Sequence, residues 1–132
     1  MATRNDITST IFTACQAVVP DIKWSYVFTG ANKSKDVEGT VSCDKITFKE
    51  LAKGETYATA NYTIFIIDMG KGYDVDSAAD ALFKVFNQSN MGHICYNVDI
   101  KSITYGSVIG VPASSLCKLE MTVEYPFEVR KE

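Results

Sequence analysis

The longest regular pattern in the chain is the alternation of residue types along 57–68, YATANYTIFIID. For almost the whole length, one parity carries apolar or aromatic side chains, namely Ala58, Ala60, Tyr62, Ile64 and Ile66. Because successive side chains point to opposite faces of a strand, this stretch predicts a long central strand. Its second half is apolar on both parities, which indicates that a helix or a partner covers the second face there.

Two other stretches have helical rather than strand periodicity. Ile7, Ile11, Ala14, Cys15 and Val18 recur at helical spacing and predict a first helix, which Pro20 ends. A second apolar stripe predicts another helix, capped by Asp74 or Asp76 and ended by Asn90 and Gly92. Its expected buried residues are Val75, Ala79, Leu82, Phe83 and Phe86.

Four more stretches have the residue content of strands: 22–28, a short strand within 39–51, 94–105, and 117–125. The apolar parity of the third changes at Ser102, which predicts a β-bulge there. The last two strands are joined by a loop and should pair antiparallel. Pro126 has no N–H to donate, so we expect pairing to weaken at that residue.

The order of these elements predicts an α+β fold, a mostly antiparallel β-sheet with two helices packed on one face. The polar segment 29–38 predicts a loop or a hairpin arm. No repeat or linker divides the sequence, so 132 residues should form a single domain.

Composition excludes several classes of protein. The chain is 46% apolar and 22% charged, which is typical of a folded protein, and its net charge of −3 gives no basic excess for nucleic-acid binding. No apolar run has the roughly 18–20 residues of a membrane span. The first ten residues lack the apolar core of a secretory signal, so we expect no export by that route.

The residues that could carry chemistry do not form a recognisable motif. The four cysteines (Cys15, Cys43, Cys95 and Cys117) are far apart without a CxxC pair, so we expect free thiols and no zinc site. His93 is the only histidine. Asp74, Asp76 and Asp80 lack the spacing of a calcium loop, and Gly70-Lys71-Gly72 lacks the frame of a phosphate-binding loop. The sequence therefore predicts no enzyme, with no catalytic, cofactor-binding or metal-binding residue.

Taken together, the elements resemble the phage tail terminator, or tail-completion, proteins. The resemblance covers nearly the whole chain and depends on a short N-terminal helix, an aromatic strand and four further motifs: YTIFIID, DVDSAADALFKVFN, SITYG and LCKLEMTVEYPF. It lies in the order and character of the elements rather than in a catalytic signature. Head–tail connector and neck proteins share much of this pattern.

The resemblance implies a structural virion protein that forms a hexameric ring on the last ring of tail tube subunits. Such a ring stops tube polymerisation and offers a surface to the head connector or collar, and contractile tails with a sheath use similar proteins. The expected partners are therefore other copies of the chain, the tube protein, and sheath and connector or collar proteins, with DNA passing through and no membrane. The expected location is a virion or tail-like particle assembled in the bacterial host cytoplasm.

Two segments outside the expected core are candidates for the subunit or tube interface. The first is the polar arm, with Asn32, Lys33, Lys35, Asp36 and Glu38, and the second is the C-terminal tail, with Phe127, Val129 and Arg130. Two alternatives stay open at this point: a head–tail connector or neck protein, and a non-viral module that binds a small ligand or a protein. An enzyme would need a role for His93.

Overall fold

The computed structural model describes residues 4–26, 37–52, 55–89, 91–92, 95 and 97–127, with the backbone alone for 50–52, 55 and 127. The helices are α1 (Arg4–Val18) and α2 (Val75–Phe86). The strands are β1 (Lys23–Ser25), β2 (Glu38–Ala52), β3 (Glu55–Asp68), β4 (Asn97–Gly106) and β5 (Ser115–Phe127).

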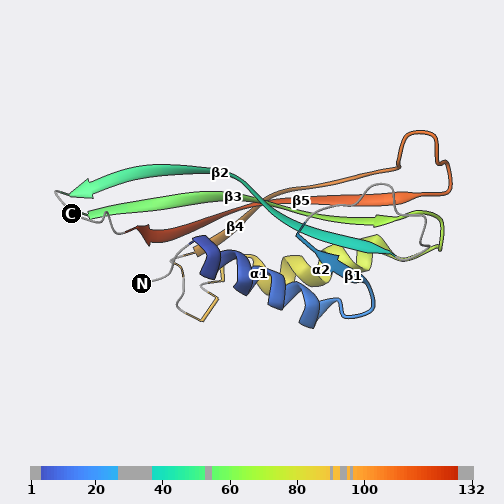
Figure 1. The fold of residues 1–132 in the computed structure, drawn as a ribbon, viewed down its shortest axis with the longest axis horizontal. Helices are drawn as coiled ribbons and strands as arrows, with labels where there is room; N and C mark the ends of the chain where they lie inside the picture. Colours follow the sequence, from blue (N-terminus) through green and yellow to red (C-terminus); the bar gives the residue numbers. More distant parts are fainter. Residues whose placement is uncertain are drawn as a thin grey trace.

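The five strands form one sheet in the order β1-β2-β3-β5-β4 (Figure 1). Only β1 and β2 pair in parallel, and the other three pairs are antiparallel, including the predicted pair of β4 and β5. Both helices lie on the same side of the sheet, α1 against β2 and α2 against β4 and β5 (Figure 1). The predicted α+β architecture is therefore confirmed.

The core lies between this helix layer and the sheet. The apolar parity predicted for the central strand is buried along its length in β3, and it is flanked by the buried side chains of β5: Cys117, Leu119, Met121, Val123 and Tyr125. From α1, Ile7, Ile11 and Cys15 pack into the same cluster. Since the helices cover only one face of the sheet, β5 and the first half of β3 alternate between buried and more exposed residues, whereas Thr63 and Ile67 on the other face of β3 are also buried.

Helix α2 begins where the sequence predicts, because the Asp74 side chain accepts a hydrogen bond from the backbone N–H of Ser77, at 3.1 Å. Two details of the prediction are wrong. Phe83 is 38% exposed, and Ala78 occupies the buried stripe instead. The helix also ends at Phe86, with Asn87 as its C-cap, several residues before Asn90.

The largest error concerns β2, which is a 15-residue strand rather than a short one. It begins at Glu38, which the sequence had placed in a polar arm; Glu38 is only 7% exposed and lies opposite Ile67. A register shift between Cys43 and Lys45 moves the apolar residues to the other parity. This bulge hid the continuous alternation on which the prediction depended.

For the remaining strands, the predictions agree with the structure only in part. A register shift between Ile100 and Ser102 confirms the predicted bulge in β4. Pairing does not weaken at Pro126, which stays in register with Tyr57, and β5 continues to Phe127. The strand predicted over 22–28 is described only as Lys23–Ser25.

One close contact supports a prediction about the β1–β2 pair. A Cβ atom built at Gly39 would lie 2.6 Å from two ring carbons of Trp24, whose indole N–H donates to the Val19 carbonyl at 2.8 Å. Gly39→Ala should therefore lower the free energy of unfolding by about 1–3 kcal/mol, measured by urea denaturation. The matched control is Gly106→Ala, where the new Cβ meets only Leu116 Cδ1 at 3.9 Å. Equal losses in both variants would contradict the steric explanation.

Candidate functional site

The face of the sheet opposite the helices is here called the open face. No described helix covers it (Figure 1). It is rich in hydroxyl and amide side chains: Thr40, Ser42, Thr47, Thr59, Asn61, Thr63, Ser102, Thr104 and Thr122. The sequence had predicted a helix or a partner over the second half of this side of β3. The prediction of a covering helix is therefore wrong, and the prediction that a partner covers this part of β3 is not tested by the structure.

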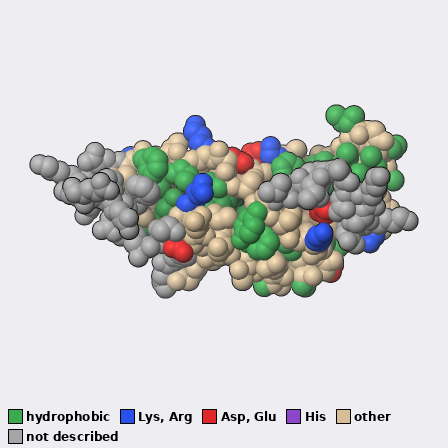
Figure 2. Space-filling view, in the orientation of Figure 1, with side chains coloured by type: hydrophobic (Ala, Val, Ile, Leu, Met, Phe, Trp, Pro, Cys, Tyr) green, Lys and Arg blue, Asp and Glu red, His purple; other side chains and the backbone are tan. Residues whose placement is uncertain are grey.

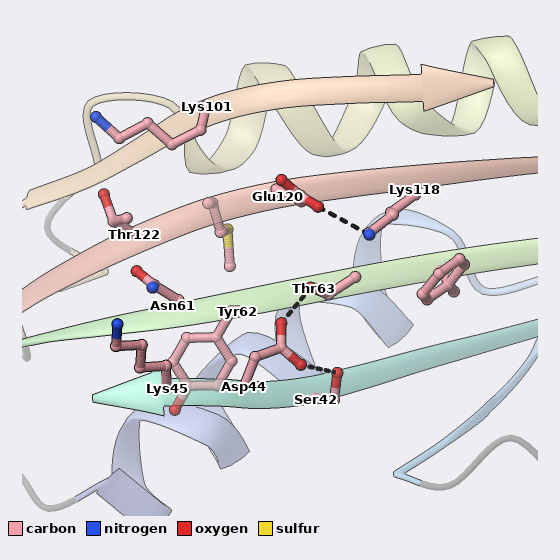
Figure 3. A pocket seen from close by; sticks show the side chains of 12 residues that line it. Ser42, Asp44, Lys45, Asn61, Tyr62, Thr63, Lys101, Lys118, Glu120 and Thr122 are labelled. Carbon is pink, nitrogen blue, oxygen red and sulfur yellow. Dashed lines mark hydrogen bonds and ion pairs between the residues drawn. The ribbon is translucent and has the colours of Figure 1, made fainter. Parts of the chain in front are cut away.

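A shallow groove with a volume of about 590 Å³ crosses the middle of the open face (Figure 3). It is lined by residues of four strands, among them Asp44, Lys45, Lys101, Lys118 and Glu120. Charged residues therefore gather where a ligand could lie. Whether they are already paired within the chain determines whether they are available for acid–base chemistry or for binding.

Two of these charged residues, Lys118 and Glu120, pair with each other, and Asp44 bonds neighbouring hydroxyl groups. The Asp44 carboxylate accepts hydrogen bonds from the hydroxyl groups of Thr63 and Ser42 (Figure 3). Lys118 and Glu120 form an ion pair at 2.9 Å, and this hydrogen bond raises the pKa of Lys118 and lowers that of Glu120. This exposed pair stabilises the charged forms of Lys118 and Glu120, so Glu120 does not have the raised pKa of a general acid.

Lys101 contacts an acid that does not line the groove, and Lys118 has a second neighbour besides Glu120. Lys101 Nζ lies 2.6 Å from Asp99 Oδ2 at the β4 edge of the sheet. Lys118 Nζ lies 5.8 Å from the centre of the Phe65 ring, close enough for a cation–π contact. The groove thus presents an ordered pattern of hydroxyl, amide and paired charged groups, which suits recognition of another surface.

The described residues hold no group of three or more histidine, cysteine or acidic side chains that could bind a metal ion. All four cysteines are free. Burial raises the pKa of Cys15 to about 12 and that of Cys117 to about 11, so both thiols stay protonated at neutral pH. His93 lies outside the part of the chain that the structure describes.

Neither described helix combines the length and the hydrophobicity needed to cross a membrane.

The described structure does not bring together the residues that the sequence predicts for a subunit or tube interface. Asn32, Lys33, Lys35, Asp36, Val129 and Arg130 lie outside the described residues, so their role stays a prediction. Phe127 ends β5 with its backbone opposite Thr56. Glu38 is buried in β2 rather than presented on an arm.

The sequence predicted the loop between β4 and β5 but not its exposed apolar character. Figure 2 shows hydrophobic side chains gathered on this loop, and Ile109 in it is fully exposed. The buried Ser114 hydroxyl holds the loop in shape, since it accepts from the backbone N–H of Val108 at 2.7 Å and donates to the Val111 carbonyl at 2.6 Å. The uncharged run SVIGVPA, unusual for a solvent-facing loop, was the available signal.

Comparison with known proteins gives a structural match. No protein-family model and no curated protein sequence matches the chain. Among solved structures, a chain from the structure titled "Virion of native gene transfer agent (GTA) particle" superposes with a TM-score of 0.60 and 13% sequence identity. The match covers 91% of this chain and 92% of the other. This protein therefore shares its fold, over nearly its whole length, with a chain of a gene transfer agent virion.

Proposed function

We propose that this protein is a structural subunit of a phage-like particle. Within that particle, it forms a ring, hexameric as in the tail terminators, that caps the head-proximal end of the tail tube. The observation that carries the proposal is the match to a virion chain over 91% of one chain and 92% of the other. Fold likeness alone does not transfer function, so the surfaces must also suit the role.

The described surfaces support a role in assembly rather than in catalysis. The open face carries paired charges, and the loop between β4 and β5 presents an ordered, uncharged apolar tip. A loop that is already ordered loses little conformational entropy on binding, which favours a permanent contact with a neighbouring subunit. The partners in this proposal are other copies of the chain, the tube protein, and connector, collar or sheath proteins.

The test is the length of tails in particles made with and without the gene, measured by negative-stain electron microscopy. Without the gene, we expect overlong, uneven and headless tails, because nothing stops tube polymerisation. Complementation with the wild-type gene is the control and should restore uniform tails joined to heads.

Two other outcomes are informative. Tails of normal, uniform length that fail to join heads would assign the protein to the head–tail connector or neck instead. Particles that are unchanged in length, number and attachment would overturn the virion proposal and leave a binding module as the better explanation.

A further inference from the structure

The outer edge of β4 is occupied by the chain itself at one end only. The backbone of Val98 bonds residues 88–89 at 2.7 and 2.8 Å, and the Ile100 N–H donates to the Asn87 side chain at 3.3 Å. Strand β4 is the last of the sheet, and no backbone hydrogen bond within the described residues reaches its outer side over 102–106. This stretch, here called the free edge, can serve as a template for pairing with another strand.

Ile103 and Tyr105 present the backbone groups of the free edge. Val98 bonds outward, so its neighbours along the strand bond inward to β5. The bulge shifts this alternation by one position, so beyond it Ser102 and Thr104 bond β5. The N–H and C=O groups of Ile103 and Tyr105 therefore point away from the sheet, and their side chains lie on its helix side.

The side chains beside the free edge are apolar with an acidic border. Ile103 is partly buried against the core, and Tyr105 is 49% exposed. Partial burial raises the pKa of Tyr105, and the carboxylates of Asp76 and Asp80 raise it further, which places these two acids of α2 near its ring. Phe83 is 38% exposed and follows Asp76 by two helical turns, so it lies on the same flank of α2. A strand added at the free edge would therefore lie beside apolar side chains and two carboxylates.

The segment 128–132, EVRKE, has the residue pattern that such a strand needs. One parity carries an apolar residue followed by a base, Val129 and Lys131. The other parity is charged throughout and suits a face turned to solvent: Glu128, Arg130 and Glu132. With the first parity on the helix side, the valine would meet the apolar part of the free edge and the lysine its two carboxylates.

A chain cannot place this segment on its own free edge. Tyr105 pairs with Cys117, which lies ten positions before Phe127 in β5 and is therefore about 33 Å away from it along the strand. Figure 1 shows the end of β5 and the loop that joins β4 to β5 on opposite sides of the molecule. The four residues from Phe127 to Lys131 span at most about 14 Å. A segment 128–132 that occupies the free edge must therefore come from another copy.

We infer that residues 128–132 of one copy add to β4 of the next copy as a short strand parallel to β4. Helix α2 runs opposite to β4, since its C-terminal end lies at Val98, so its two acids border the Tyr105 end of the free edge. The base of the added strand belongs at that end, with Lys131 beside Tyr105 and Val129 beside Ile103. The contact is head-to-tail, which generates a ring where the rotation closes. This inference rests on the ring of the proposed function and names one of its contacts.

Deletion of residues 128–132 tests the occupant of the free edge, with assembly measured by analytical ultracentrifugation. The dissociation constant of the assembly should rise at least about a hundredfold, because the backbone groups of Ile103 and Tyr105 lose their partners. The free energy of unfolding of the separate subunit, measured by urea denaturation, should not change. Assembly equal to that of the wild type would refute the contact.

Charge reversal tests which parity of the segment faces α2. Lys131→Glu should raise the dissociation constant about fivefold, because the new carboxylate would face the acids of α2. The double variant Lys131→Glu with Asp80→Lys should regain assembly. The matched control is Arg130→Glu, which makes the same change of charge on the other parity and should assemble as wild type. Equal effects of Lys131→Glu and Arg130→Glu would overturn the proposed orientation.

Cysteine cross-linking tests whether the contact joins two copies. In a Cys43→Ser background, a Tyr105→Cys chain mixed with a Lys131→Cys chain should form a disulfide between the chains on air oxidation, identified by peptide mass spectrometry. A chain that carries both substitutions and closes the disulfide within itself would overturn the inference, and so would a wild-type protein that stays monomeric.

The inference and the proposed function fail separately. Normal assembly after deletion of residues 128–132 would refute this contact and leave the proposed function standing. Particles that are unchanged without the gene would refute that function independently.

Discussion

Replacing Leu82 with alanine should lower the free energy of unfolding by about 2–5 kcal/mol, a large share of the roughly 5–15 kcal/mol of a typical domain. Leu82 is 0% exposed and lies at the centre of the apolar stripe of α2. This helix packs against β3, β4 and β5 at once, so a cavity beneath it has little room to collapse. The loss therefore combines the transfer of the missing carbons with the cavity that they leave.

Urea denaturation followed by circular dichroism measures this loss. Lys84→Ala is the matched control, since Lys84 is exposed on the same helix and alanine has a high helix propensity. The control should stay within about 0.5 kcal/mol of wild type. A Leu82→Ala protein as stable as the Lys84→Ala protein would show that α2 does not seal the core.

The architecture was predictable because the helices cover only one face of the sheet. In β5 and the first half of β3, this leaves an alternation of buried and more exposed residues, which the sequence displays directly. The cap at Asp74 was equally visible, since its physical cause is local: a carboxylate that satisfies a free N–H of the first helical turn.

Features that depend on distant contacts were not predictable. The sequence suggested neither the insertion of β5 between β3 and β4 nor the parallel addition of β1. Phe83 has the spacing of a buried residue, yet it lies at the margin of the stripe, where the sheet no longer covers the helix. The bulge at Asp44 shifted the alternation of β2 and made a long strand resemble a short one.

The candidate site illustrates the same limit. Polarity outside the expected core led to residues 29–38 and to the C-terminal tail. The groove on the open face instead gathers Asp44, Lys101 and Lys118 from three strands that are far apart in the sequence. Nothing in their local sequence relates these residues, so the groove is a property of the folded chain.

The second large effect is expected at the turn between β3 and α2. Asp68 is 1% exposed, and its carboxylate accepts hydrogen bonds from the backbone N–H groups of Gly70, Lys71 and Tyr73, at 3.1, 2.7 and 2.9 Å. Asp68→Ala would leave these donors without an acceptor and should destabilise the protein on the order of 3 kcal/mol. The control is Asp76→Ala, an exposed acid in the first turn of α2, which should have a much smaller effect in the same urea experiment.

The pH dependence tests the charge at this turn separately. Burial alone would raise the pKa of Asp68, but the hydrogen bonds from the turn outweigh it and hold the pKa below the usual value of 3.8. A group with a lowered pKa in the folded state stabilises the protein fully above its unfolded pKa, and this contribution is lost as the pH falls through the folded value. Asp68→Asn removes the charge and keeps the size of the side chain. The difference in unfolding free energy between wild type and Asp68→Asn should therefore be largest near neutral pH and shrink below about pH 4. A difference that stays constant down to about pH 2 would mean that the shape of the side chain, and not its charge, organises the turn.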